Sequence, residues 1–411
     1  MIQSSTGAPE NMKEAKALRC DWIVLPMLGL LTIALTLAST EAIARGMFFQ
    51  TKTTAESCMV LNDPSTGTRG IPGCVCWEKM GENQPVEYRF NSSGYRAEAE
   101  FGPKPPGRYR IVIVGSSFAM GMRVPMEEVL STRLPAELSD QTGRRVEIFN
   151  EGMAGNGGSP RSVALRFNDA LAAKPDMILW ILTPWDIHYV SRIMPEDDMP
   201  AGNRVFWGRT RRLVKESLAR KSIPEALHGL SEAVASRLIA DRTRLMLQHF
   251  LYENQSLCVK SYLRGGDEEA GFLRAEPSTE WQGRLGQFGN YAAELERRAR
   301  AAGIPLVAVF LPERAQAAMI SMGEWPPDYD PYKLDDELHF IITSHGGTYI
   351  DILPEFRGIP NPEQGYFPVD GHLNAGGHAV ISRLLARELT GGAIPALKIS
   401  AQQPAALEQR R

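Results

Sequence analysis

Hydrophobic and polar positions along the chain predict strands that alternate with helices over most of its length. Helices such as 284–302 carry their apolar residues on one face at helical spacing. Strands that alternate with helices form a parallel sheet covered on both faces. The pattern therefore predicts an α/β fold, a three-layer α/β/α sandwich with a parallel five-stranded sheet. The expected strands are short apolar runs at 111–114, 146–149, 177–182, 306–311 and 349–353.

The longest uninterrupted apolar run lies near the N-terminus. Residues 22–40 contain no charged side chain and match the roughly 20 residues that span a bilayer as a helix. A cleaved signal peptide is the alternative, because residues 42–44 offer a small-residue cleavage pattern. Since the run is longer than the roughly 7–15 residues of a signal core, we expect an uncleaved anchor. The preceding basic residues favour a cytoplasmic N-terminus, which places the rest of the chain on the periplasmic side.

The same pattern divides the chain into segments. We expect a cytoplasmic N-terminus at 1–21, the transmembrane anchor, a Cys-containing loop-rich region with a hairpin at 41–107, the α/β domain at 108–392 and a flexible tail at 393–411.

A helical insertion is expected at 189–279 within the α/β domain. Between residues 204 and 221 it interleaves basic and apolar residues. Three interpretations fit: a helical subdomain whose charged face meets water, a cap over the substrate, and a helix resting on an anionic membrane surface. The basic residues are Arg204, Arg209, Arg211, Arg212, Lys215, Arg220 and Lys221.

Composition narrows the range of partners. The net charge of −3 over 411 residues is small and of mixed sign, so nothing indicates a nucleic-acid partner. Cys58 lies near Cys74 and Cys76 in sequence, and a disulfide from Cys58 to either one would staple this loop-rich stretch in an oxidising compartment. Unpaired thiols are the alternative. A metal needs more donors nearby, so neither a metal nor a cofactor is expected.

Candidate chemistry lies at a serine turn and near the C-terminus. The strand at 111–114 is followed at once by Gly115-Ser116-Ser117 and then by a predicted helix opened by Pro125. Such turns lie outside the carboxyl end of a strand, where open α/β sheets bind ligands. Asp370-Gly371-His372 precedes another predicted helix. Residues two apart can place the carboxylate against Nδ1 and leave Nε2 free to face a serine.

Together with 149–158, these stretches resemble the SGNH (GDSL-type) hydrolase family over roughly residues 86–389. The resemblance implies a flavodoxin-like sheet with the catalytic residues Ser117, Asp370 and His372. Ser117 is preferred to Ser116 as the nucleophile, and His372 is preferred to His378 as the base.

The family also implies an oxyanion hole of three hydrogen-bond donors. These are the backbone N–H groups of Ser117 and Gly152 and an asparagine side chain, whose place Trp185 occupies here. We therefore expect Asn156 or a water to supply the third donor. Trp185 is expected to line the acyl pocket, and Asp186 to brace its loop.

The implied function is ester hydrolysis, or transfer of a small acyl group such as acetyl, through an acyl-serine intermediate. Exported, membrane-anchored proteins of this type often act on cell-envelope carbohydrate, so carbohydrate esters lead over small-molecule esters. The alternative is a catalytically impaired SGNH-fold protein that binds carbohydrate or serves as a scaffold. The sequence leaves the oligomeric state open.

Overall fold

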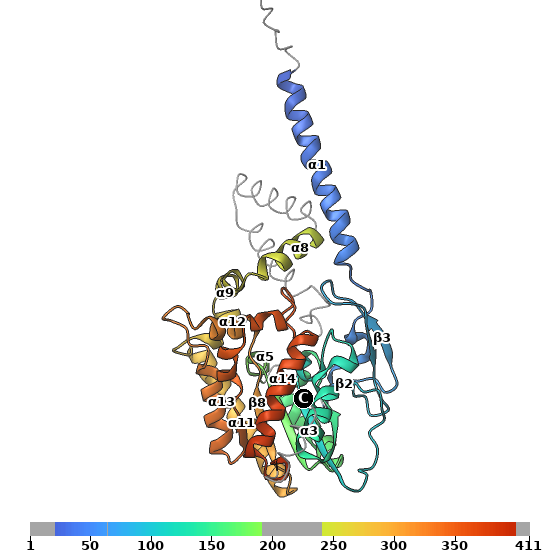
Figure 1. The fold of residues 1–411 in the computed structure, drawn as a ribbon, viewed down its shortest axis with the longest axis vertical. Coiled ribbons are helices and arrows are strands. Elements are labelled where there is room, and N and C mark those ends of the chain that lie inside the picture. Colours follow the sequence, from blue (N-terminus) through green and yellow to red (C-terminus); the bar gives the residue numbers. More distant parts are fainter. Residues whose placement is uncertain (1–20, 64, 191–240, 400–411) are drawn as a thin grey trace, which may run out of the picture.

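The core of the protein is a five-stranded parallel sheet. The computed structural model describes residues 21–63, 65–190 and 241–399 (Figure 1). The strand order is β6-β5-β7-β8-β9, which is 2-1-3-4-5 when the core strands are counted along the chain, the order of flavodoxin-like sheets. The predicted fold class is therefore confirmed. The strands are β5 (Arg108–Gly115), β6 (Arg145–Asn150), β7 (Met177–Leu182), β8 (Leu306–Phe310) and β9 (Thr348–Ile350).

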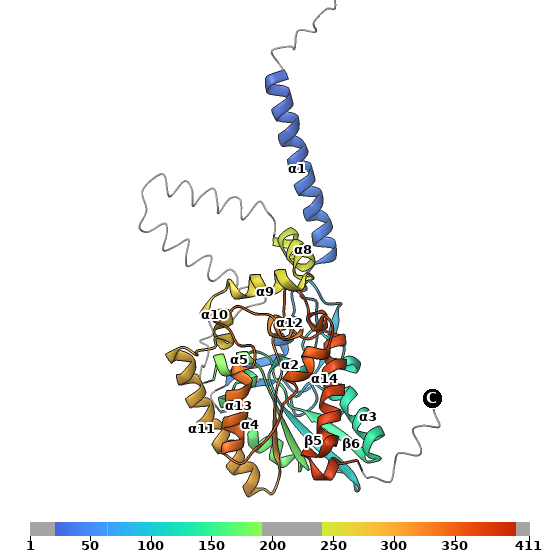
Figure 2. The ribbon, with the colours of Figure 1, turned by 60° about the vertical axis from the view of Figure 1, so that its left-hand side comes forward.

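Helices cover both faces of this sheet (Figure 2). On one face lie α3 (Leu130–Thr142) and α14 (Ala375–Glu388), and on the other lie α4 (Pro160–Ala172), α11 (Thr279–Ala301) and α13 (Lys333–Ser344).

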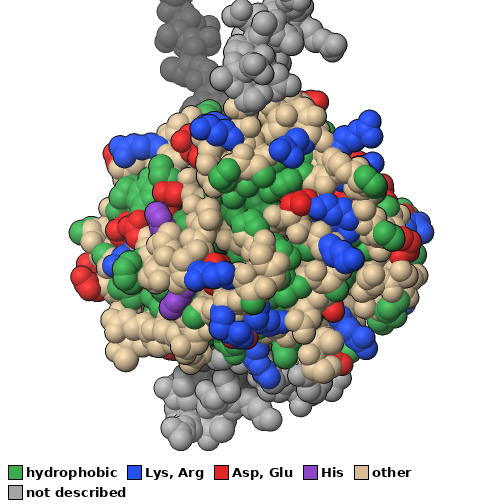
Figure 3. All heavy atoms as spheres, turned by 90° about the horizontal axis from the view of Figure 1, so that it is seen from below, with side chains coloured by type: hydrophobic (Ala, Val, Ile, Leu, Met, Phe, Trp, Pro, Cys, Tyr) green, Lys and Arg blue, Asp and Glu red, His purple; other side chains and the backbone are tan. Residues whose placement is uncertain are grey.

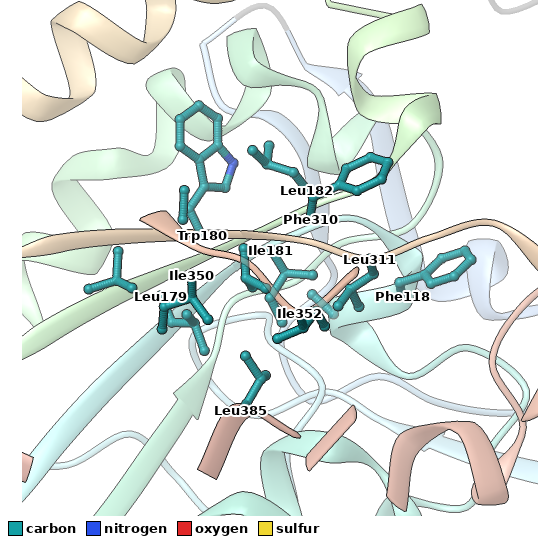
Figure 4. Packing of buried hydrophobic residues seen from close by; sticks show 14 of the residues in the cluster. Phe118, Leu179, Trp180, Ile181, Leu182, Phe310, Leu311, Ile350, Ile352 and Leu385 are labelled. Carbon is teal, nitrogen blue, oxygen red and sulfur yellow. The ribbon is translucent and has the colours of Figure 1, made fainter. Parts of the chain in front are cut away.

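All six residues of the central strand β7 are buried, which explains why residues 177–182 are all apolar. Its side chains alternate between the two faces. The Trp180 ring contacts Phe288 of α11 with centroids 5.4 Å apart, while Leu385 of α14 packs from the opposite side (Figure 4).

Several helix positions differ from the prediction. The serine turn leads directly into a short helix, α2 (Ser117–Met120), and the stretch after Pro125 is a 3-10 turn that precedes α3. α11 begins five residues before the predicted start, because the Ser278 hydroxyl caps it by accepting the N–H of Trp281 (3.3 Å). α12 (Arg314–Met322) was not predicted.

The region before the sheet forms two small antiparallel ribbons beside the core domain. The expected hairpin forms at 86–97, where β4 is followed by a turn at 91–94 and a short return that bridges Phe90 and Arg96. β4 also pairs with β3, a pairing that was not predicted. Cys58 and Cys74 form a disulfide, and Cys76 is a buried free thiol. The strands are β1 (Met59–Asp63), β2 (Gly67–Gly70), β3 (Val75–Glu78) and β4 (Val86–Arg89).

α1 (Asp21–Met47) projects away from the domain (Figure 1). Within the described chain, its part Val24–Met47 is the one helix long and apolar enough to cross a membrane, and its side chains are almost all exposed. This agrees with either an anchor or a signal sequence.

The described part of the insertion contains α8 (Asp241–Tyr252), α9 (Gln255–Leu263) and α10 (Asp267–Ala270). α8 packs against the C-terminal end of α1. The basic residues of 204–221 lie outside the described residues.

The C-terminal segment differs from the expected tail. Residues 389–397 form short helical turns whose Ile394 and Leu397 side chains are buried, so the folded domain extends past residue 392. The face turned away from α1 carries basic and acidic side chains interspersed with apolar ones (Figure 3).

Candidate active site

Ser117 lies where β5 ends and α2 begins, at the carboxyl edge of the sheet. It is the first residue of α2, and Gly121 ends the helix in the left-handed conformation (φ 76°). Gly158 packs closely against the backbone of this turn, because a Cβ on Gly158 would lie 2.3 Å from the Ser116 Cα. The Ser117 hydroxyl is partly exposed, whereas Ser116 is buried. The local packing therefore presents Ser117 to the site and turns Ser116 inward.

Asp370 and His372 lie in a tight turn just before α14. Gly371 between them has a left-handed φ of 82°, which favours glycine. The turn is closed by hydrogen bonds from the Phe367 N–H to the His372 carbonyl (2.8 Å) and from the Gly371 N–H to the Phe367 carbonyl (2.9 Å). The turn thereby aims both side chains at α2.

The three predicted side chains form one hydrogen-bonded chain. His372 Nδ1 lies 2.8 Å from Asp370 Oδ2, and His372 Nε2 lies 2.8 Å from Ser117 Oγ. A carboxylate at Nδ1 fixes the tautomer that leaves Nε2 able to accept the serine proton. The geometry is that of a nucleophile, a general base and an orienting group.

Arg123 joins this chain and was missed by the sequence analysis. Its guanidinium contacts Asp370 Oδ1 and lies 3.6 Å from the buried carboxylate of Glu78 on β3. Its backbone is left-handed (φ 67°) and its N–H donates to the Tyr88 hydroxyl (2.6 Å). No sequence motif marks such a residue, because its partners come from strands that lie about 35 to 45 residues earlier in the chain.

The surroundings keep His372 in its neutral form. Burial lowers the pKa of His372, the positive charge of Arg123 lowers it further, and the negative charge of Glu78 opposes them. A neutral imidazole is the form that can take a proton from serine. The site is therefore set for general-base chemistry in its resting state.

The predicted oxyanion donor Gly152 lies against the nucleophile helix. A Cβ on Gly152 would be 2.5 Å from the Met120 N. Its N–H, however, donates to Asn150 Oδ1 (3.0 Å), and the Asn150 amide in turn donates to the Ala119 carbonyl (2.8 Å). Gly152 can therefore serve an oxyanion only by sharing or releasing its bond to Asn150. This constraint was not foreseen.

Asn156 lies in a 3-10 turn (Gly155–Gly158) that packs beside α2 and is itself buried. This places the residue near the nucleophile helix, and its role as the third donor remains a prediction.

Trp185 occupies the first turn of α5 (Pro184–His188), after the end of β7. Burial raises the pKa of Glu313 and an interaction with the Trp185 side chain lowers it, and the Trp185 ring stacks on Tyr189 with centroids 5.9 Å apart. Asp186 braces the loop, because its Oδ2 accepts from both the N–H and the hydroxyl of Thr183 (2.8 Å each). Trp185 therefore lies next to the Glu313 carboxylate.

Glu313, missed by the sequence analysis, lies beside the catalytic turn. One of its oxygens is 3.9 Å from where a Cβ on Gly371 would be. Burial raises the pKa of Glu313 to about 8, and the nearby negative charge of Asp186 adds to the rise. Burial likewise raises the pKa of Asp186 to about 7, with Thr183 opposing. A glutamate soon after the carboxyl end of a core strand is the signal that could have found it.

His378, the competing histidine, has a structural role. It is buried in α14, and its Nδ1 accepts the N–H of Leu130 at the start of α3 (3.3 Å). Burial lowers the pKa of His378, so it is the neutral form that caps α3. Within the described residues, no group of three or more His, Cys, Asp or Glu side chains is placed to hold a metal ion.

Comparison with known proteins gives likenesses among solved structures alone. No family model matches the chain, and no curated protein matches it. The chain is similar to the lipase/acylhydrolase from Enterococcus faecalis, with 14% identity, a TM-score of 0.38, and coverage of 71% of this chain and 98% of the other. It is also similar to a catalytic mutant of the acetylxylan esterase Axe2 from Geobacillus stearothermophilus, with 10% identity, a TM-score of 0.37, and coverage of 68% and 94%. These likenesses do not indicate what this chain acts on.

Proposed function

We propose that this protein is a serine esterase or acyltransferase that works through an acyl-serine intermediate. The observation that carries the proposal is the hydrogen-bonded chain from Asp370 through His372 to Ser117. In the first step, Ser117 Oγ attacks the ester carbonyl carbon while His372 Nε2 takes its proton. Asp370 stabilises the imidazolium that forms. His372 then gives the proton to the leaving alcohol as the acyl-serine is left behind.

The second half of the reaction reuses the same groups. Water, or an acceptor hydroxyl in the case of transfer, loses its proton to His372 and attacks the acyl carbon. Collapse of that intermediate releases the acid or the new ester and returns the proton to Ser117. In both halves the oxyanion needs donors, for which we propose the Ser117 N–H, the Gly152 N–H and Asn156.

The proposed substrate is an ester of cell-envelope carbohydrate outside the cytoplasm. α1 would anchor the chain in the membrane, and the Cys58–Cys74 disulfide suits an oxidising compartment. Trp185 and Tyr189 are partly exposed and stack on each other after the carboxyl end of β7, and we propose that they pack against a sugar or a small acyl group.

Turnover of a chromogenic acetyl ester and of an acetylated oligosaccharide tests this proposal. Ser117→Ala is expected to abolish turnover, and Ser116→Ala, its matched neighbour, is expected to retain more of it. Release of acetate without an acceptor sugar supports hydrolysis, and acetylated acceptor supports transfer. No turnover by the intact chain on any of these esters would contradict the proposal.

A second candidate is a carbohydrate-binding or scaffold protein on the same fold. It is favoured by one specific observation: the N–H of Gly152, one of the proposed oxyanion donors, is already bonded to Asn150 Oδ1. Loss of one oxyanion donor typically costs ~10²–10³ in turnover. Oligosaccharide binding by a chain that turns over no ester would support this second candidate.

A further inference from the structure

α8 carries an apolar face that is exposed among the described residues of the chain. Leu247, Phe250 and Leu251 are exposed by 51%, 52% and 53%, and the exposed Arg244 shares their face at helical spacing. Three large apolar side chains on one face of a helix differ from the scattered exposed residues that are normal on a protein surface. This face is therefore a candidate interaction surface.

The opposite face of α8 fixes the helix to the domain through His249, whose Nδ1 lies 2.7 Å from Glu82 Oε1. The start of α8 is fixed to α1 as well. The N–H and the hydroxyl of Thr243 both donate to Glu41 of α1 (3.1 and 2.9 Å). Glu41 is the first charged residue after the uncharged run 22–40. The contact therefore holds α8 at the level where α1 would leave a bilayer, and both ribbon views show α8 at the base of α1 (Figures 1 and 2).

The end of α1 near α8 also exposes apolar side chains. Ile43 and Met47 of α1 are exposed by 59% and 54%, and Phe49, just after the helix, by 44%. We propose that α8 lies in the interfacial region of the bilayer that α1 crosses. Leu247, Phe250 and Leu251 would then reach the acyl-chain boundary, with Arg244 near the lipid phosphates. The proposal rests on the membrane anchor and goes beyond it, because a second contact fixes the orientation of the domain on the membrane.

Depth-dependent fluorescence quenching in the full-length chain tests this contact. The chain, carrying Cys20→Ser, is reconstituted into phosphatidylcholine/phosphatidylglycerol vesicles and labelled with NBD at Leu247→Cys or, in a second variant, at Phe250→Cys. Phe340→Cys is the matched control, since Phe340 is a 69% exposed apolar residue on α13. Leu31→Cys reports on the anchor itself. The native thiols Cys76 and Cys258 are both buried.

We expect lipids with a doxyl group near the interface to quench NBD at positions 247 and 250 but not at 340, and lipids with a doxyl group deep in the acyl chain to quench NBD at position 31. Quenching at 31 without quenching at 247 and 250 overturns the α8 proposal and leaves the anchor intact. This includes the result in which a protein segment or a second copy shields α8. No quenching at 31 contradicts the anchor, and the α8 proposal with it.

Glu82 provides a second inference from a different observation. It lies in the loop between β3 and β4, and its side chain is 2% exposed. Its carboxylate accepts the N–H groups of Val369 (3.1 Å) and Asp370 (2.8 Å), and lies 2.7 Å from His249 Nδ1 of α8. We infer that Glu82 is a positioning residue. It holds the backbone of Asp370, so that the side chain of Asp370 reaches His372.

Steady-state kinetics with active-site titration test this role. Glu82→Ala is expected to lower kcat per titrated Ser117 while KM changes little, and Glu82→Gln is expected to restore much of it, because an amide oxygen can accept the same N–H groups. Glu87→Ala, on the adjacent strand β4 and more exposed, is the matched control. A merely structural role would lower the melting temperature and the titratable fraction but leave kcat per site unchanged.

Wild-type kcat per titrated site in Glu82→Ala, or Glu82→Gln no better than Glu82→Ala, overturns the inference. A wild-type chain without esterase activity would instead contradict the proposed function, so the two failures are distinguishable.

Discussion

The guanidinium of Arg123 contacts the same carboxylate, that of Asp370, which orients His372. The contact gives the Asp370 carboxylate a second partner besides His372, and it places a positive charge near His372. It also links the core domain to the ribbon region before it, since Arg123 is held by Tyr88 and Glu78. The ribbons therefore contribute to the site although they lie outside the α/β sheet.

The pH dependence of activity is the first prediction. Arg123 disfavours the imidazolium form and lowers the pKa of His372, so Arg123→Gln should raise that pKa. The acid limb of the kcat/KM profile should then move to higher pH, and activity at mildly acidic pH should fall. The control is Arg89→Gln, an exposed arginine on β4. An acid limb that stays in place, or moves to lower pH, would contradict the assigned effect of Arg123.

The second prediction concerns close packing at Gly152. Gly152→Ala should displace α2, because the added Cβ would lie 2.5 Å from the Met120 N. Overpacking of this kind costs about 1–3 kcal/mol, and here it also moves the nucleophile. Thermal unfolding and ester turnover measure the two effects. Gly102→Ala is the control, since a Cβ there meets nothing within 4 Å. A fully active Gly152→Ala would show that Gly152 is not packed against the nucleophile helix.

The third prediction separates two candidates for the oxyanion donor. Asn156→Ala should lower kcat by ~10²–10³ if the Asn156 side chain is the third donor. Trp185→Phe should cost less, because a phenyl ring can keep the stacking on Tyr189 and the third donor is assigned to Asn156. The reverse order, with Trp185→Phe the more damaging in folded protein, would assign the donor to the indole.

The fourth prediction concerns the disulfide. It closes a loop of 16 residues in the ribbon region, whose strands β3 and β4 contact Arg123. A disulfide that closes a loop of this length stabilises the folded state by about 3 kcal/mol. Cys58→Ser should therefore lower the melting temperature clearly, whereas Cys76→Ser, which removes a free thiol, should lower it much less. Equal effects of the two substitutions would mean that the disulfide does not stabilise this region.

The sequence predicts well what depends on local pattern. The five strands follow from apolar runs, and Ser117, Asp370 and His372 follow from two short motifs at strand ends and helix starts. Ser159 and Asn374 cap α4 and α14 in the same local way, since each accepts a backbone N–H there (3.3 and 3.1 Å).

What the sequence does not predict depends on contacts between distant segments. Arg123, Glu82 and Glu313 act through partners on other elements, and none belongs to a motif. The pairing of β4 with β3, which adds to the return at Phe90 and Arg96, was likewise not predicted. The bond between Asn150 and Gly152 is local, yet the choice of partner for that N–H depends on how Asn150 is held by α2.

Covalent labelling with a fluorophosphonate tests the central claim most directly. Attack by Ser117 Oγ on phosphorus expels fluoride and leaves a stable phosphonyl-serine, which requires the same activated hydroxyl as ester cleavage. Tryptic peptide 111–123 contains both serines, and fragment masses distinguish them. We predict a single label on Ser117 that is lost in His372→Ala and slowed in Asp370→Asn. An unlabelled wild-type chain, or a label on Ser116, would contradict the account.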